Sequence, residues 1–199
     1  MSDATWDERY SKSEYVWTDT VNQFVQQYLS DLPPGSAVDL GAGEGRNAVW
    51  LARRGWSVTA VDFSAVGLDK GRRLAADHEV DVEWVVADAT TWQSPRPVDL
   101  VVLSYLQLEV DDRRTAVEHA ASWLAPGGRV FVIAHDQSNV EHGVGGPPST
   151  AVCYDVAETV SWVDGLSIPL VVDVAEVAQR RVGDEVALDT LVIAVRPRD

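Results

Sequence analysis

A strand that passes through three closely spaced glycines into a helix is the feature that most constrains this chain. It lies in the segment Val38-Asp39-Leu40-Gly41-Ala42-Gly43-Glu44-Gly45-Arg46-Asn47. Glycine is favoured where the backbone needs a positive φ, or where a ligand approaches the main chain without meeting a Cβ. The start of the following helix offers unpaired N–H groups and a positive dipole end. The segment therefore predicts a cofactor site, whose residues would be Gly41, Gly43, Gly45, Arg46 and Asn47.

Several interpretations of this loop remain open. Dinucleotide-binding loops place their third glycine or alanine one residue later, where this chain has Arg46, and an acid, Asp39, precedes the first glycine. No lysine follows at the position that a phosphate-binding Walker loop requires. A strand–helix turn with incidental glycines is the interpretation that needs no ligand.

Short valine-rich segments alternate with longer helical patterns beyond residue 37. This order is typical of βαβ units and a parallel sheet covered by helices on both faces. Ser64 and Asp112 are suitable N-cap residues, and Gly55 a suitable C-cap residue. The segments are predicted strands at 37–40, 57–61, 82–86, 99–104 and 129–135, and predicted helices at 47–54, 64–78 and 112–123.

The two ends of the chain carry weaker patterns. Residues 18–29 predict an amphipathic helix, and Pro126-Gly127-Gly128 predicts a sharp turn. A long polar loop is expected at 135–150. Apolar runs at 168–179 and 185–195, separated by Gly183-Asp184, predict an antiparallel hairpin. A short helix is expected between the loop and the hairpin, at 154–163.

Two acids end successive predicted strands and extend the cofactor hypothesis. Asp62, about twenty residues after the first glycine, could accept both hydroxyls of a ribose, or could simply begin the following helix. Asp88 could reach an adenine amino group while the small Ala89 leaves space for the ring; its alternative is an Asx turn. Ligands bind at this edge of open α/β sheets, which favours the first interpretation of both acids.

Charge and composition limit the classes of partner. The formal net charge is −15, which disfavours nucleic acid, and the paired arginines at 53–54, 72–73, 113–114 and 180–181 are interpreted as solvated faces. The single cysteine, Cys153, excludes an internal disulfide. We expect a soluble, cytoplasmic protein without a signal peptide or membrane span. We expect a monomer or homodimer that binds no metal.

Taken in order, these motifs resemble the class I S-adenosylmethionine-dependent methyltransferases. The glycine loop is similar to that family's first motif, Asp62 to its ribose-binding acid, and Val86-Ala87-Asp88-Ala89 to its adenine-contacting segment. Within the family, the chain is most similar to the tellurite-resistance and thiopurine-type enzymes. The resemblance implies a Rossmann-like, doubly wound, seven-stranded α/β sheet, parallel except for an antiparallel final strand. One domain is expected over 1–199, with a lid and helix at 1–36, a cofactor core at 37–135, and a substrate loop and hairpin at 136–199.

The resemblance also implies roles for individual residues. Arg9 and Tyr10 would bind the methionine carboxylate of S-adenosylmethionine under a cover formed by Trp6, and Phe63 would pack on adenine. The alternative for this aromatic-rich start is packing of Trp6, Tyr10, Tyr15 and Trp17 onto the sheet. The complete predicted set is Trp6, Arg9, Tyr10, Asp39, Gly41, Gly43, Gly45, Arg46, Asn47, Asp62, Phe63, Ser64, Asp88 and Ala89, with Ser104, Tyr105 and Leu106 on the sulfonium side.

The expected activity is methyl transfer to a heteroatom of a small molecule. Such chemistry needs alignment more than a catalytic group, because the cofactor carries the reactive methyl. If a general base is used, His135 with Asp136 is the first candidate and His142 the second; polar capping of the loop is their alternative role. A non-catalytic binding protein of the same fold, an NAD-dependent oxidoreductase, and a DNA- or protein-modifying methyltransferase are competing hypotheses.

Overall fold

The computed structural model describes residues 3–11, 16 and 18–198, and the side chains from Trp6 onward within them. Tyr15 and Trp17, named above as packing candidates, lie outside the described residues. The chain divides into two compact units, residues 1–93 and residues 94–199, which we describe separately. None of the helices in the described part has both the length and the hydropathy to span a membrane.

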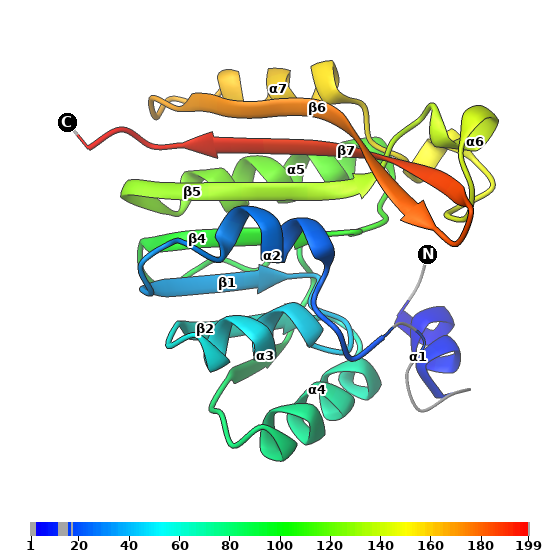
Figure 1. Ribbon diagram of the computed structural model, residues 1–199. Helices are drawn as coiled ribbons and strands as arrows, with labels where there is room; N and C mark the ends of the chain where they lie inside the picture. The colour runs from blue at the N-terminus through cyan, green and yellow to red at the C-terminus, as the bar shows by residue number, and fades with distance from the viewer. Residues whose placement is uncertain (1–2, 12–15, 17, 199) are drawn as a thin grey trace. The chain divides into compact units, whose positions relative to one another are not determined.

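The first unit contains three parallel strands in the order β3-β2-β1 (Figure 1). Leu40 pairs with Val61 and Asp62 with Val86, so the carboxyl ends of the three strands align. The elements are α1 (Asp3–Ser11), α2 (Gln23–Leu29), β1 (Ser36–Leu40), α3 (Arg46–Arg53), β2 (Ser57–Asp62), α4 (Ala65–Asp77) and β3 (Glu83–Val86).

Helix ends in this unit mostly follow the sequence signals. Ser64 caps α4 by accepting from the Gly67 N–H, and Gly55 follows α3 with φ +87°. The helix predicted at 18–29 is shorter, because Asn22 has a non-helical backbone and its side chain accepts from the Phe24 and Val25 N–H groups. That cap fixes the start of α2 at Gln23.

The second unit contains four strands in the order β4-β5-β7-β6 (Figure 1). β4 and β5 are parallel, while β7 runs antiparallel to both β5 and β6, which confirms the predicted hairpin. The elements are β4 (Val98–Ser104), α5 (Val110–Ser122), β5 (Leu124–His135), α6 (Asn139–His142), a 3₁₀ turn (Thr150–Val152), α7 (Val156–Asp164), β6 (Val171–Val182) and β7 (Glu185–Val195).

Three predictions for this unit need correction. Pro126-Gly127-Gly128 lies within β5 rather than in a turn, because Gly127 donates to the Arg196 carbonyl and Gly128 accepts from the Arg196 N–H, each at 2.8 Å. Asp112 is not the N-cap of α5, since the helix begins two residues earlier, after Glu109. The polar loop at 135–150 contains the short helix α6.

The paired arginines are not all solvated. Arg113 is only 2% exposed and donates to the Leu108 and Ala151 carbonyls at 3.1 and 2.6 Å. Arg180 is half-buried in an ion pair with Asp189. Both residues have carbonyl or carboxylate partners, and these hydrogen bonds offset the desolvation cost of burying a guanidinium.

Candidate active site

The glycine loop between β1 and α3 has the backbone that its sequence predicts. Gly41, Gly43 and Gly45 have φ values of +77°, +55° and +76°, which residues with a Cβ rarely adopt. The N–H groups of Gly41 and Ala42 both donate to the Val61 carbonyl, at 2.8 and 3.0 Å. The loop is therefore anchored to the end of β2 and held open as a series of left-handed turns.

A Cβ would be excluded at Gly43 and at Gly45 by different neighbours. A Cβ on Gly45 would lie 2.5 Å from the ring of Trp84, and one on Gly71 would lie 2.4 Å from the same ring. A Cβ on Gly43 would instead meet the hydroxyl of Tyr10 at 2.7 Å. Gly45 is thus required by the packing of β3 against α3 and α4, whereas Gly43 lies beneath the N-terminal helix.

Asp39, at the carboxyl end of β1, is a buried carboxylate with unused hydrogen-bonding capacity. Its side chain is 1% exposed, and neither oxygen makes a hydrogen bond within the described part of the chain. Burial raises the pKa of Asp39 to about 7, and the nearby Asp62 charge adds to the effect. The Ala48 amide and the Arg46 guanidinium oppose this shift. A buried carboxyl group without a hydrogen-bond partner, next to the glycine loop, indicates a binding site for a ligand that carries a hydrogen-bond donor or a positive charge.

Asp62, at the carboxyl end of β2, is bound to the loop itself. Its Oδ2 accepts from the Gly43 N–H at 2.8 Å and its Oδ1 from the Ser64 N–H at 2.9 Å. Burial raises the pKa of Asp62, and these two hydrogen bonds oppose that shift. Each carboxylate oxygen has a further lone pair, so the side chain can still accept from a diol such as a ribose.

Helix α1 lies against this loop and against α4. The Tyr10 ring is 6% exposed and contacts the Gly43 and Gly67 positions, while Asp7 accepts a short hydrogen bond from the Ser64 hydroxyl. Trp6 stacks at 5.5 Å from the Tyr10 ring centroid, and the Arg9 guanidinium lies 5.0 Å from the Trp6 ring. Trp6, Arg9 and Tyr10 are therefore assembled next to Gly43 and Ser64, as both the lid hypothesis and the packing alternative require.

A buried ion pair beside the loop was not anticipated from the sequence. Glu44 accepts from Lys70 Nζ at 2.7 Å, and its two oxygens also face the Val16 N–H at 2.9 and 3.1 Å. Lys70 also lies 5.8 Å from the Tyr10 ring centroid. A Glu within a glycine loop and a Lys mid-helix carry no distinctive sequence signal, so only the fold reveals their pairing.

The other predicted cofactor residues in this unit differ in burial and in hydrogen bonding. Asn47 is buried and its Oδ1 accepts from the Asn22 N–H at 3.0 Å, and Arg46 Nη1 lies 3.5 Å from the Thr18 hydroxyl. Asp88 is exposed and forms an Asx turn with Thr90, at 2.7 Å to both the N–H and the hydroxyl. Phe63 is half-buried and Ala89 is buried. Asn47 thus connects α3 to the start of α2 through its hydrogen bond with the Asn22 N–H.

In the second unit, the chain after β4 is tightly constrained. Tyr105 has φ +56°, a left-handed value that is uncommon for a residue with a large side chain. The Ser104 hydroxyl is buried and has no hydrogen-bond partner among the described residues. The Leu106 carbonyl accepts from the Tyr154 hydroxyl at 2.9 Å, and the Arg113 guanidinium lies 5.1 Å from the Tyr154 ring centroid.

A cluster of polar side chains surrounds Tyr105. Its hydroxyl donates to Asp189 Oδ2 at 2.8 Å, and Arg180 Nε lies 2.7 Å from the same oxygen. His135, at the end of β5, has its ring centroid 4.9 Å from that of Tyr105 and its Nδ1 3.2 Å from Asp189 Oδ1. We call Tyr105, His135, Arg180 and Asp189 the β7 cluster. The polar pair Asp189-Thr190 within an apolar strand was the available sequence signal for it.

The other two candidates for a base are placed differently. Asp136 Oδ2 accepts from the Thr190 hydroxyl at 2.6 Å, and Oδ1 accepts from the Ser138 N–H at 2.9 Å. His142 is exposed and lies 3.8 Å from a Glu141 oxygen. The structure therefore gives Asp136 a role in holding the loop after β5, and it does not bring His142 to the β7 cluster. In the described part of the chain, no group of acidic, His or Cys side chains is arranged to hold a metal ion.

Comparison with known proteins finds likenesses over part of the chain. Residues 37–128 match the model of the methyltransferase domain. Ribosomal RNA small subunit methyltransferase C of Alcanivorax borkumensis is 32% identical over 107 residues, which cover 51% of this chain and 33% of that protein. Ubiquinone biosynthesis O-methyltransferase of Nitrosomonas europaea is 25% identical over 139 residues, covering 62% of this chain and 59% of that protein. Over part of its length, the chain is thus similar to proteins that are named as methyltransferases.

Solved structures show the same fold. The N-methyltransferase NodS from Bradyrhizobium japonicum, in complex with S-adenosylhomocysteine, has a TM-score of 0.75 at 16% identity and covers 99% of this chain and 100% of its own. TehB from Haemophilus influenzae has a TM-score of 0.73 at 14% identity, covering 96% and 67%. The predicted Rossmann-like methyltransferase fold, with its antiparallel final strand, is confirmed by these likenesses.

Proposed function

We propose that this chain is a methyltransferase that uses S-adenosylmethionine to methylate a heteroatom of a small-molecule acceptor. The observation that carries the proposal is the Asp39 carboxyl group, which is buried, has no hydrogen-bond partner among the described residues, and lies at the start of a left-handed glycine loop. A native carboxylate in that position is costly unless a ligand supplies donors or positive charge.

The residues of the first unit fit this cofactor. Gly41 and Gly43 present backbone without side chains, and Asp62 retains lone pairs for hydroxyl groups. Bound S-adenosylmethionine would supply an electrophilic methyl group on a sulfonium. In this proposal, Asp39 and Asp62 orient the bound molecule, while Trp6, Arg9 and Tyr10 cover it and exclude water. Phe63, Asp88 and Ala89 would hold the adenine end, and Ser104, Tyr105 and Leu106 the sulfonium end.

A small acceptor is favoured by the charge of the chain. The net charge of −15 opposes the phosphate contacts on which nucleic-acid binding depends. The relatives that the chain matches include both a ribosomal RNA methyltransferase and a ubiquinone-pathway O-methyltransferase, and only part of each is matched. We propose a single domain in which residues 1–36 cover the cofactor, 37–135 bind it and 136–199 select the acceptor.

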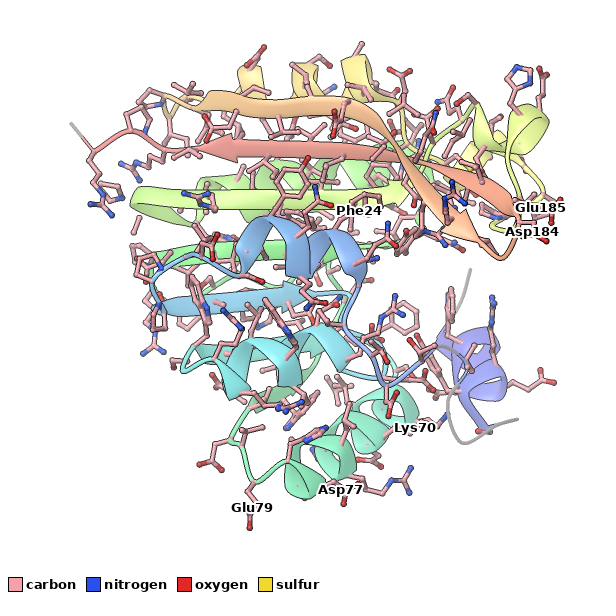
Figure 2. All side chains as sticks on the ribbon, in the orientation of Figure 1. Phe24, Lys70, Asp77, Glu79, Asp184 and Glu185 are labelled. Atoms are coloured by element: carbon pink, nitrogen blue, oxygen red, sulfur yellow. The ribbon has the colours of Figure 1, made fainter. Side chains whose placement is uncertain are left out.

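Isothermal titration calorimetry with S-adenosylmethionine, S-adenosylhomocysteine and NAD tests the proposed function. We expect micromolar binding of the first two and no binding of NAD. Asp62→Ala should weaken S-adenosylmethionine binding at least tenfold. The Gly43 and Ser64 N–H groups would lose their acceptor, and the ribose hydroxyls of the ligand would lose theirs. Asp77→Ala, at the exposed end of α4 (Figure 2), is the matched control and should bind as the wild type does. Binding of NAD alone would contradict the proposal and favour an oxidoreductase. Binding of S-adenosylmethionine without turnover on a broad acceptor panel would favour a non-catalytic protein.

A further inference from the structure

The Asp39 carboxyl group receives no hydrogen bond from the described residues. Its side chain is 1% exposed, and it stands in β1 immediately before Leu40, the last residue of the strand, and two residues before Gly41. The Ala48 N–H on α3 is near enough to lower the pKa of Asp39, yet it does not meet hydrogen-bond geometry. A carboxylate buried in this way bears the desolvation penalty of its charge without compensation.

The charges that act on Asp39 come from β2 and from α3. Asp62, at the end of β2, accepts from the Gly43 and Ser64 N–H groups at 2.8 and 2.9 Å, and these bonds favour its charged form. A negative charge on Asp62 disfavours a second one on Asp39. The Arg46 guanidinium opposes this effect, but its side chain is only partly buried and its influence is the smallest of those on Asp39. The surroundings therefore favour Asp39 in its neutral, protonated form.

Lys70, a buried cation of the same unit, is already paired. Its Nζ lies 2.7 Å from Glu44 Oε1, and the two side chains are only 6% and 2% exposed. The pair carries no net charge, and neither member is among the groups that shift the pKa of Asp39. Within the part of the chain that the structure describes, Arg46 is thus the only cation that acts on Asp39, and it makes no hydrogen bond to the carboxyl group. Full compensation of an ionised Asp39 has to come from a ligand.

The chemistry of the carboxyl group limits what the ligand must present to it. An ionised carboxylate is an acceptor at both oxygens, so it needs N–H or O–H donors as well as positive charge. An ammonium group supplies both, because it has three donors and a unit charge. A sulfonium has the charge without such a donor, and a ribose hydroxyl has a donor without the charge. Of the polar groups of S-adenosylmethionine, the ammonium therefore suits Asp39 best.

We propose that loading of the cofactor is proton-coupled, and that Asp39 releases its proton to solvent as it receives the ammonium group of S-adenosylmethionine. The inference rests on the cofactor proposed above. The O–H bond of the carboxylic acid breaks, its electron pair stays on the carboxylate, and the buffer takes the proton. The ammonium group keeps its own three protons, and no covalent bond to the ligand forms. Because Asp39 has to lose a proton for the ligand to bind, acid weakens binding.

Calorimetric titration in buffers of different ionisation enthalpy counts the protons released on binding. At pH 6 the free chain keeps most of the Asp39 proton, since its pKa is about 7. The ammonium of the ligand is fully charged at that pH, because α-amino groups titrate at about 7.7–8.0. We expect about one proton released with S-adenosylmethionine and with S-adenosylhomocysteine, and an affinity that rises about five- to tenfold from pH 5.5 to 6.5.

A third ligand tests the assignment to the ammonium group. 5′-Methylthioadenosine has the ribose but neither the ammonium nor the sulfonium, so it should release no proton. Release equal to that of S-adenosylhomocysteine would assign the effect to the ribose and overturn the proposal. Release with S-adenosylmethionine alone would assign it to the sulfonium, with the same consequence.

Asp39→Asn is the decisive variant, because an amide keeps the shape of the side chain but has no proton to release. We expect its release at pH 6 to fall below about 0.2 proton and its affinity to lose the pH dependence. Asp77→Asn, at the exposed end of α4 (Figure 2), is the matched control and should release as many protons as the wild type.

Two results would overturn the inference. One is a wild type that binds S-adenosylmethionine and releases less than about 0.3 proton at pH 6, and this count decides even where Asp39→Asn binds too weakly to measure. The other is undiminished release from Asp39→Asn, which would assign the proton to another group such as Asp62. Failure of the wild type to bind S-adenosylmethionine and S-adenosylhomocysteine at all would instead refute the proposed function, so the two failures are distinct.

Discussion

At the scale of single residues, the carboxyl group of Asp39 links the proposed site to stability. Its pKa is raised from 3.8 to about 7 by burial, so between these values the folded state holds a proton that the unfolded state has released. The free energy of unfolding therefore falls as the pH rises from 4 to 7, and the full loss is reached above pH 7. A shift of this size corresponds to at most about 4 kcal/mol.

Asp39→Asn should remove this pH dependence, because the amide cannot ionise. We expect the variant to gain about 1–4 kcal/mol of unfolding free energy relative to the wild type between pH 4 and pH 8, measured by urea denaturation without ligand. The exposed Asp31→Asn serves as the control and should show no such gain. A difference between Asp39→Asn and the wild type that stays constant over this range would show that Asp39 ionises normally. The same variant should bind S-adenosylmethionine more weakly.

Single residues also show where sequence reasoning reached its limit. The requirement for glycine at 41, 43 and 45 could be predicted, because positive φ is a local property of a strand–loop–helix turn. The burial of Arg113 and Asp189 could not, because Ala151 beside Arg113, and Tyr105 and His135 beside Asp189, come from segments tens of residues away. A pair of arginines on a helix is more often solvated than buried, and only the fold places carbonyl groups around Arg113.

At the scale of elements, the pair of Glu44 and Lys70 joins the glycine loop to α4. Lys70, labelled in Figure 2, extends from α4, and its ammonium is 2.7 Å from the Glu44 carboxylate, with both side chains nearly inaccessible. Removing one partner of such a pair leaves an uncompensated buried charge. The chain offers a matched surface pair in Arg72 and Asp69, which lie on the same helix and are well exposed.

Lys70→Met should lower the unfolding free energy by about 3–5 kcal/mol, and the double variant Glu44→Gln, Lys70→Met should recover most of that loss. Arg72→Met should change stability by less than about 1 kcal/mol, because an exposed ion pair contributes little. Chemical denaturation of the four proteins at pH 7 gives the comparison. Equal losses for Lys70→Met and Arg72→Met would mean that the buried pair is solvated in solution.

Elements also differ in how well their ends could be predicted. Helices with a local cap signal, such as α4 after Ser64, begin where the sequence indicates. β5 extends through Pro126-Gly127-Gly128 because the Arg196 backbone provides its partners, and a turn motif read locally cannot reveal a distant strand. Local chemistry thus determines the caps, and long-range pairing determines the lengths of the strands.

At the scale of the whole molecule, alternating strand and helix patterns were sufficient to predict the fold class. The order of strands and helices along the chain indicates parallel βαβ units and a final hairpin. The acceptor was not predictable, because methyltransferases share a fold and differ in the side chains that select a substrate. The property of the whole chain that bears most directly on the proposed cofactor is its charge. Thirty-one acidic residues against sixteen basic ones give a field that attracts cations.

This field leads to a prediction that separates two nearly identical ligands. S-adenosylmethionine carries a sulfonium charge that S-adenosylhomocysteine lacks, so only the first gains from a net charge of −15. Raising the ionic strength from 0.01 to 1 M shortens the Debye length from about 30 to about 3 Å. We therefore expect the affinity for S-adenosylmethionine, measured by calorimetry, to fall on the order of three- to tenfold across that range, while the affinity for S-adenosylhomocysteine changes little. An equal salt dependence for both ligands would mean that the sulfonium is recognised only by groups in direct contact with it, and that the acidic surface acts on solubility alone.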